Sequence, residues 1–140
     1  MSPDWHLDMY AAAMAILRAK DIAGRQIRQV RRQRGWTAEH LASRFADAGI
    51  SIPHTVITET ETGRRDRRLP VDEVLAFAHI LAVPPLALLI PGANDVLQVV
   101  PGVEMDAAKA LEWMQGDLCE TCHGKPAAGF TCNTCGRAGS

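Results

Sequence analysis

The stretch RGWTAEHLASRFADAGISIPHTVITETETG, at residues 34–63, predicts two short helices joined by a turn. Thr37 is a good N-cap for the first helix, and Pro53 suits the first position of the second. The first helix carries a complete apolar stripe at positions i, i+3, i+4 and i+7. Its members are Ala38, Leu41, Ala42 and Phe45. This stretch therefore predicts a mainly α fold.

Three further helices are predicted around this pair. Residues 22–34 form a basic helix with Ala23, Ile27 and Val30 on one face. Another helix follows Pro70, and a short one begins at Pro84 and ends before Pro91. The helix after Pro70 has a predicted core stripe of Val71, Val74, Leu75, Ala78 and Leu81, and Leu41, Ala42, Phe45 and Ile57 complete the expected core. Five helices in residues 22–91 thus enclose a helix-turn-helix unit.

The flanking segments are also apolar on one side. Residues 4–20 and 104–115 predict helices, and residues 96–100 are strand-like. Their apolar side chains are expected either to pack back on the five helices or to form a dimer interface. Met9 or Met14 is an alternative start of the chain. The residues concerned are Trp5, Met9, Tyr10, Leu17, Trp113 and Met114. The expected division is an N-terminal helix (1–21), the five-helix domain (22–91), a linker with an acidic helix (92–117) and a C-terminal module (118–140).

Charge is distributed unevenly along the chain. The 140 residues are 47% hydrophobic and 22% charged, typical of a globular protein, and the net charge is −1. Twelve of the 15 basic residues and six of the 16 acids lie in residues 18–68, so that segment carries +6 and the remainder −7. Such asymmetry suggests a polyanionic partner for the basic segment. No apolar run approaches the roughly 20 residues of a membrane span, and no signal peptide is expected.

Four groups of residues match one family pattern. They are Gly24, Arg25, Ile27 and Arg28; Arg34, Gly35, Trp36, Thr37, Glu39, Leu41 and Ala42; Thr55, Val56, Ile57, Glu61, Gly63, Arg64 and Arg65; and Pro70, Leu75, Ala78, Leu81 and Val83. On these residues, positions 22–90 resemble the lambda-repressor-like family, the Cro-type or XRE-type helix-turn-helix regulators. The connection between the two motif helices is longer than in compact members of that family.

The resemblance implies that the helix at 53–62 reads the major groove of double-stranded DNA. It places His54, Thr55 and Glu59 at base-facing positions, with Thr58 beside them. Histidine donates to guanine, threonine contacts a thymine methyl, and glutamate accepts from cytosine N4. The alternative for each residue is an ordinary solvated surface position.

Phosphate contacts are expected on both sides of that helix. Thr37 and the free amides at the start of the helix that follows it suit an anion. The arginines after the recognition helix suit the DNA backbone, and they are Arg64, Arg65, Arg67 and Arg68. The resemblance also implies that Glu61 pairs with a basic side chain of the helix at residues 22–34, Arg25 or Arg28. The other arginines of the helix at residues 22–34 either contact phosphates or form a solvated face.

All four cysteines lie near the C-terminus, as Cys119-x-x-Cys122 and Cys132-x-x-Cys135 separated by nine residues. Two such pairs supply the tetrahedral sulfur set of one structural Zn²⁺. The segment resembles a small zinc ribbon or zinc knuckle, folded by its metal. Redox dithiols, free thiols and a c-type haem attachment at Cys119–His123 remain alternatives. A four-cysteine site has no open position for catalysis.

These features together predict a cytoplasmic, nucleoid-associated regulator that binds DNA as a homodimer and represses transcription. No enzyme motif stands out in the sequence. A second class is an antitoxin-like or adaptor protein, whose C-terminal half and zinc module bind another protein. A third class is a redox or metal sensor that uses the cysteines.

Overall fold

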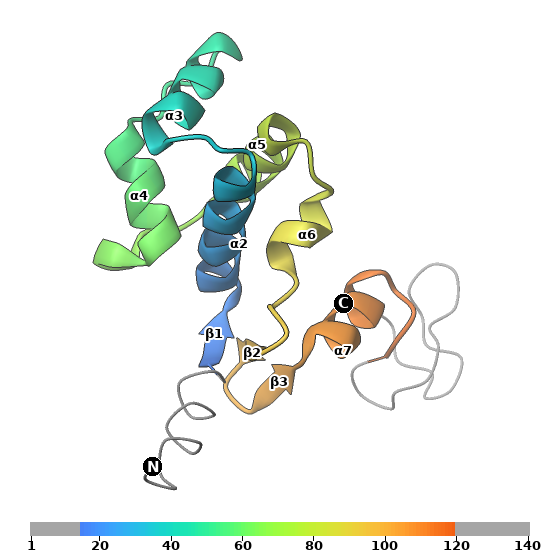
Figure 1. Ribbon diagram of the computed structural model, residues 1–140. Helices are drawn as coiled ribbons and strands as arrows, with labels where there is room; N and C mark the ends of the chain where they lie inside the picture. The colour runs from blue at the N-terminus through green and yellow to red at the C-terminus, as the bar shows by residue number, and fades with distance from the viewer. Residues whose placement is uncertain (1–14, 120–140) are drawn as a thin grey trace, which may run out of the picture.

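The computed structural model describes residues 15–119, apart from the side chain of Arg65. The elements are β1 (Ala15–Arg18), α2 (Ala19–Gln33), α3 (Ala38–Asp47), α4 (His54–Thr62), the 3-10 turn η1 (Arg64–Asp66), α5 (Val71–Leu81), α6 (Pro85–Leu89), β2 (Asp95–Val100), β3 (Val103–Met105) and α7 (Ala107–Met114). This part of the chain is mainly helical with a small three-stranded sheet. The helices α2 to α6 lie above the sheet, and α7 lies beside it (Figure 1). No described helix is both long enough and apolar enough to cross a membrane.

The helix predicted at residues 4–20 is wrong over residues 15–18, which form β1; residues 4–14 lie outside the described part. Side chains alternate along this strand, with Ile16 exposed and Leu17 half-buried, as the two-residue period of a strand requires. Leu17 lies opposite Leu97 of β2 in a parallel register. Pairing with β2 therefore overrides the helical preference of this segment, and α2 begins at Ala19, earlier than predicted.

The sheet has the order β1-β2-β3. Strand β1 is parallel to β2, and β2 is antiparallel to β3. Parallel strands need a long crossover, because the chain must return to the same end of the sheet. Here that crossover contains α2 to α6. The strand-like segment at 96–100 is confirmed within β2. The helix predicted at 104–115 is confirmed over residues 107–114 as α7, whose N-cap Asp106 accepts a hydrogen bond from the Lys109 amide at 2.9 Å. Its predicted start is wrong, because Glu104 and Met105 belong to β3.

The main core lies between α2, α3, α4, α5 and α6. Leu41, Phe45, Ile57 and Leu81 were predicted to be core residues, and all four are fully buried. Ala42 is partly buried against the same cluster. The remaining buried members are Ile27, Phe77, Ala78 and Leu88.

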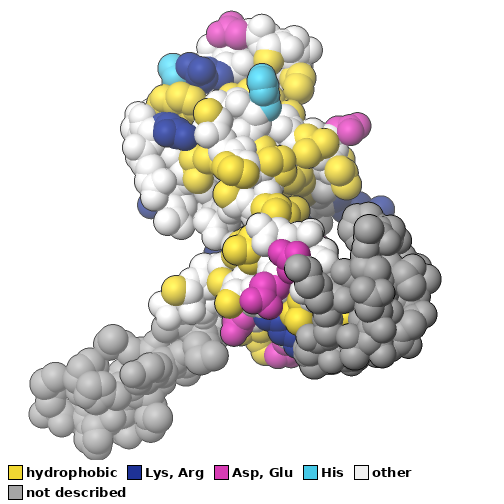
Figure 2. Space-filling model, turned by 90° about the vertical axis from the view of Figure 1, so that its right-hand side faces the viewer, with side chains coloured by type: hydrophobic (Ala, Val, Ile, Leu, Met, Phe, Trp, Pro, Cys, Tyr) yellow, Lys and Arg dark blue, Asp and Glu magenta, His cyan; other side chains and the backbone are white. Residues whose placement is uncertain are grey.

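The predicted core face of α5 is wrong at two positions. The side chains of Val71 and Leu75 are 74% and 51% exposed. The helix is instead turned so that Phe77 enters the core, where its ring meets that of Phe45 edge to face, with centroids 4.8 Å apart. A phenylalanine buries more apolar surface than a leucine or valine, so the orientation that buries Phe77 is favoured. On the surface seen in Figure 2, hydrophobic side chains gather in the upper part of the molecule.

A second, smaller core joins the sheet to the helices. Ile22 at the start of α2 packs with Leu97, Met105 and Ala110. The predicted linker, residues 92–117, contains β2, β3 and α7. Three of the six flanking apolar residues, Leu17, Trp113 and Met114, pack back on this core. The other three, Trp5, Met9 and Tyr10, lie outside the described residues.

Candidate nucleic-acid interface

The helices α3 and α4 form the predicted pair, connected by residues 48–53. The Thr37 hydroxyl oxygen accepts a hydrogen bond from the His40 amide at 3.0 Å, which confirms Thr37 as the N-cap of α3. Pro53 occupies the N-cap of α4 and not its first turn. Gly63 ends α4 with a φ of 71°, a left-handed conformation that glycine adopts without strain. The local signals in the sequence therefore mark the start of α3 and both ends of α4, with α4 beginning one residue later than predicted.

The inner face of α4 is attached to α2 by an unusually close backbone approach. A Cβ atom placed on Gly24 would lie 2.1 Å from the carbonyl oxygen of Thr60. Only glycine fits there, because any side chain would meet rigid backbone. Ile57 is fully buried beside this contact. The side of α4 that carries Ile57, Thr60 and Glu61 is thus fixed against the domain.

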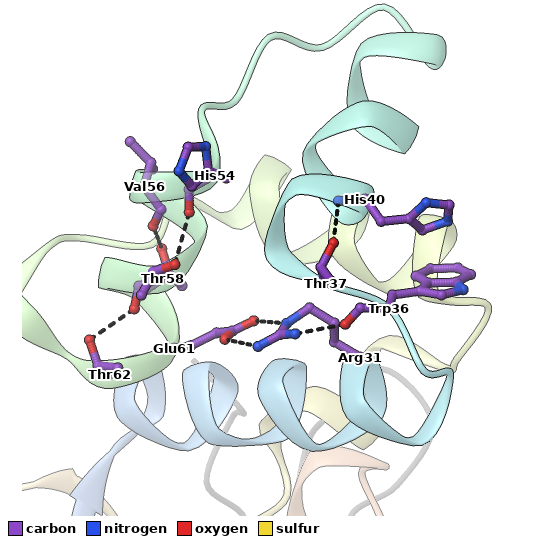
Figure 3. A network of polar contacts seen from close by, with 10 residues as sticks. Arg31, Trp36, Thr37, His40, His54, Val56, Thr58, Glu61 and Thr62 are labelled. Atoms are coloured by element: carbon purple, nitrogen blue, oxygen red, sulfur yellow. Dashed lines mark hydrogen bonds and ion pairs between the residues drawn. The ribbon is translucent and has the colours of Figure 1, made fainter.

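A two-armed ion pair between Arg31 and Glu61 reinforces that attachment (Figure 3). Arg31 Nε and Nη2 donate to the two carboxylate oxygens of Glu61 at 2.7 and 2.9 Å, and Nη1 donates to the carbonyl of Trp36 at 2.7 Å. The Glu61 side chain is only 2% exposed. Its hydrogen bond to Arg31 raises the pKa of that guanidinium. The pair fixes α4 and the start of α3 to the same point of α2.

The predicted partner of Glu61, Arg25 or Arg28, is therefore wrong. Both residues lie on the exposed side of α2, and Arg25 donates to Asp95 at 3.2 Å. Arg31 instead follows the buried Ile27 by four positions, which places it on the face that meets α4. That spacing is a signal in the sequence, but selecting Arg31 from it also requires knowing which face of α2 meets α4.

The outer face of α4 carries the predicted base contacts. His54, Thr55 and Thr58 are exposed, and Glu59 is half-buried. The Thr58 hydroxyl donates to the His54 carbonyl at 3.0 Å, and the Thr62 hydroxyl donates to the Thr58 carbonyl at 2.8 Å (Figure 3). Both hydroxyl protons are used within the helix, so each oxygen remains an acceptor. The face offers a histidine, threonine acceptors and threonine methyl groups.

The starts of α3 and α4 lie close together. His54 Nε2 is 3.8 Å from Glu39 Oε1, across the gap between the two helices. Thr37, the predicted phosphate contact, is two residues before Glu39, whose carboxylate faces His54, a predicted base contact. The first amides of α3 have no acceptor within their own helix, as at every helix start. At this end of the helix pair the His40 amide is bound to Thr37, and the Glu39 carboxylate lies beside the polar face of α4.

The arginines after α4 have different environments. Arg64 and Arg68 are exposed. Arg67 donates to both oxygens of Glu73, at 2.7 and 3.1 Å, and to the Thr60 hydroxyl at 3.1 Å. Arg67 thus connects the loop to α5, and we do not retain it as a phosphate contact. The side chain of Arg65 lies outside the described residues.

Asp66 holds the same loop against the start of α2. Its carboxylate accepts hydrogen bonds from Lys20 and from Arg18, the latter at 2.8 Å. These two hydrogen bonds hold the pKa of Asp66 below its ordinary value. Asp66 adopts a left-handed backbone with a φ of 48°, a region in which aspartate and asparagine are more common than other side chains. The loop conformation is therefore fixed from two sides.

Comparisons of the chain with protein-family models, with curated proteins and with solved structures found no match. The site is consequently described by its own geometry. One polar helix face, two adjacent helix starts and two exposed arginines lie around α4.

Glu39, Glu59 and Asp66 lie at this surface, on α3, on α4 and in the loop after α4, whereas a further group of acidic residues lies away from it. They gather at the level of the sheet and α7, in the lower half of Figure 2. They include Asp95, Glu104, Asp106, Glu112 and Asp117. The acids of residues 95–117 are therefore separated in space from most of the arginines, which lie on and around α2 and α4.

The predicted zinc ligands are almost entirely beyond the described part of the chain. Cys119 is its last residue and is half-buried. Cys122, Cys132 and Cys135 lie outside it. Within residues 15–119 no cluster of three or more metal-ligating side chains is present. The four-cysteine zinc site stays a prediction from the sequence.

Proposed function

We propose that this protein is a sequence-specific regulator of transcription that reads the DNA major groove with α4. Its helical part is then a lambda-repressor-like helix-turn-helix domain, as the sequence resemblance implies. The observation that supports this most is the division of α4 into two sides. One is fixed to α2 through Gly24, Ile57 and Glu61, while the other exposes His54, Thr55 and Thr58.

A rigid helix with one free polar face suits base recognition, because base edges must be met in a fixed orientation. His54 and Thr55 lie at the N-terminal end of α4, the part of a recognition helix that meets base edges. In this proposal Thr37, at the start of α3, and Arg64 and Arg68, which follow the C-terminal end of α4, bind phosphates, with Arg65 beside the two arginines in sequence. Repression follows when the bound protein occupies a promoter, and a homodimer would read a two-fold operator.

The test is selection of preferred duplexes from a random pool, followed by binding measurements on the zinc-loaded full chain. We expect specific binding that weakens by about 10³-fold or more between about 50 and 200 mM salt. Replacing Thr55 by alanine should relax the sequence preference at one position, by about 1–3 kcal/mol of discrimination. Gln115→Ala, an exposed change just after α7, is the matched control and should leave the preference unchanged.

Failure to enrich any sequence, with a folded wild-type protein, would overturn this proposal. A stable copurifying protein in place of DNA would then favour the adaptor class. Loss of DNA binding on oxidation, with no loss on chelation, would favour the sensor class. Sedimentation of the protein with and without its operator tests the homodimer.

A further inference from the structure

The exposed side of α2 carries a row of long polar side chains without an acid among them. We call this row the α2 polar stripe, and it follows the i, i+3, i+4, i+7, i+8 pattern of one helix face. All of its members are exposed, and they are Arg25, Arg28, Gln29, Arg32 and Gln33. Each of these side chains is a hydrogen-bond donor. A helix face rich in donors, with three cationic side chains and no acid, is suited to an anion.

A groove runs between the α2 polar stripe and the last turn of α4. It is open to solvent, has a volume of about 740 Å³, and has Thr62 on its α4 side. Glu61 lies at its base, but the carboxylate is neutralised by its two hydrogen bonds to Arg31. The α2 wall of the groove is therefore cationic, the α4 wall carries Thr62, and the one acid that lines the groove is already paired.

Two arginines of the groove lack partners. Arg25 shares its guanidinium with Asp95. For Arg28 and Arg32, the described part of the chain supplies neither an acidic partner nor a hydrogen-bond acceptor. They are four residues apart on the helix, about 6 Å along its axis. Unpaired guanidiniums at this spacing repel each other, and an anion placed between them removes that repulsion.

The groove continues the outer face of α4. Thr55, Thr58 and Thr62 are at positions i, i+3 and i+7 and share one side of that helix. Thr55 is a proposed base contact, and Thr62 lines the groove. A duplex placed against the N-terminal end of this face extends along α4 toward the α2 polar stripe. The groove is thus in reach of the same DNA molecule.

We propose that Arg28 and Arg32 bind phosphates of the DNA backbone in the groove between α2 and α4. This inference rests on the proposed function and extends it to a second group of backbone contacts, separate from those around α3 and the arginine loop. Arginine suits this role because its guanidinium matches a phosphate through two parallel hydrogen bonds. Gln29 and Gln33 supply further donors beside them.

The test compares the full-length wild type with an Arg28→Gln and Arg32→Gln double variant, on the selected operator and on a scrambled duplex. Each phosphate contact contributes about 0.9 to the slope of log affinity against log salt. We therefore expect the double variant to lower that slope by about 1.8 on both duplexes. The ratio of operator to scrambled affinity should stay the same, since phosphate contacts carry no sequence information.

Lys109→Gln on α7 is the matched control, because it removes one positive charge far from the groove. Circular dichroism and thermal unfolding check that each variant is folded. A double variant with the wild-type salt slope, in a protein that binds its operator, overturns this inference and leaves the proposed function intact. Absence of DNA binding by the wild type overturns the proposed function first.

A second arm separates DNA from a free phosphorylated ligand. Titration with inorganic pyrophosphate, in the absence of DNA, should give only weak and salt-sensitive binding. Tight pyrophosphate binding that depends on Arg28 and Arg32, together with an unchanged DNA salt slope, would assign the groove to a small phosphorylated ligand and overturn the inference.

Discussion

Arg31 of α2 and Glu61 of α4 face each other through two hydrogen bonds of 2.7 and 2.9 Å, with the carboxylate almost completely buried. Without Glu61, the largely buried Arg31 guanidinium would be stabilised neither by water nor by an opposite charge. We therefore expect Glu61→Ala to lower the free energy of unfolding by about 3 kcal/mol. The measurement is chemical denaturation, with Glu112→Ala, an exposed acid on α7, as the control.

The same pair allows a sharper form of the experiment. Replacing both partners by apolar residues of similar size, Arg31→Met with Glu61→Leu, removes the unpaired charge. The double variant should recover most of the lost stability, because a buried ion pair contributes little beyond an apolar contact of equal volume. Double and single variants of equal stability would show that the pairing itself is not what matters at this contact.

Gly24→Ala tests the close approach of α2 and α4. In an ordinary helix interior this change stabilises by about 1 kcal/mol. Here the new Cβ would lie 2.1 Å from the carbonyl oxygen of Thr60, so the helices must move apart. We expect destabilisation by about 2–3 kcal/mol, measured by denaturation. Gln29→Ala, on the exposed side of the same helix, should change stability by less than about 0.5 kcal/mol.

Asp66 should make part of the stability depend on acid pH. Hydrogen bonds from Lys20 and Arg18 hold its pKa below the ordinary 3.8. A carboxyl group with a lowered pKa in the folded state stabilises fully above its ordinary pKa, and this contribution is lost as the pH falls through the folded value. The advantage of wild type over Asp66→Asn should thus be constant near neutrality and shrink below about pH 4.

Asparagine is a suitable replacement in this comparison, because it also tolerates the left-handed backbone of Asp66. Unfolding of both proteins is followed at a series of pH values. Added salt should reduce the difference between them, since the side chain is exposed to solvent and its charge is screened. A difference that persists unchanged to strongly acid pH would contradict the ion pairs.

Arg67 and Arg68 are neighbours that should respond differently to replacement by alanine. Arg67 is bound to Glu73 and Thr60, so Arg67→Ala should lower the free energy of unfolding by about 1.5 kcal/mol. Arg68 is exposed, and Arg68→Ala should leave stability within about 0.5 kcal/mol. Its effect should be on DNA binding, with a salt slope lower by about 0.9. Denaturation and salt-dependent binding measure both, and the reverse pattern would contradict this assignment.

The cysteine cluster predicts a metal content. We expect about one zinc per chain by elemental analysis, and none after Cys119→Ser combined with Cys132→Ser. His123→Ala is the matched control, since four thiolates complete a tetrahedral site without histidine. Loss of zinc from the His123 variant would place that histidine among the ligands in place of a cysteine.

Local signals in the sequence determined most of the helical architecture. Thr37, Pro53, Pro70 and Gly63 mark helix ends through their own backbone and capping chemistry, and the structure has helix ends at each of them. The apolar stripe of α3 likewise points inward at Leu41 and Phe45. Such features depend on neighbours within a few residues, so they can be predicted from the sequence without knowledge of the tertiary structure.

The errors arose where distant residues decide the outcome. Residues 15–18 are a strand because β2 pairs with them from the far side of the helical segment. The packing of Phe77 against Phe45 decides which face of α5 is buried. The sequence pattern of α5 alone did not distinguish this face from the one that carries Val71 and Leu75. The choice of Arg31 over Arg25 and Arg28 follows from helix phase, but it also required knowledge of which face meets α4.

The parallel pairing of β1 with β2 has a consequence for the order of folding. Ala15 lies opposite Asp95, so the two strands meet only after the whole intervening segment has been brought back to one end. Closing so long a loop of unfolded chain is entropically unfavourable, and compact helices shorten it. We expect the helices to assemble first, with the strands joining last and separating first when the molecule opens.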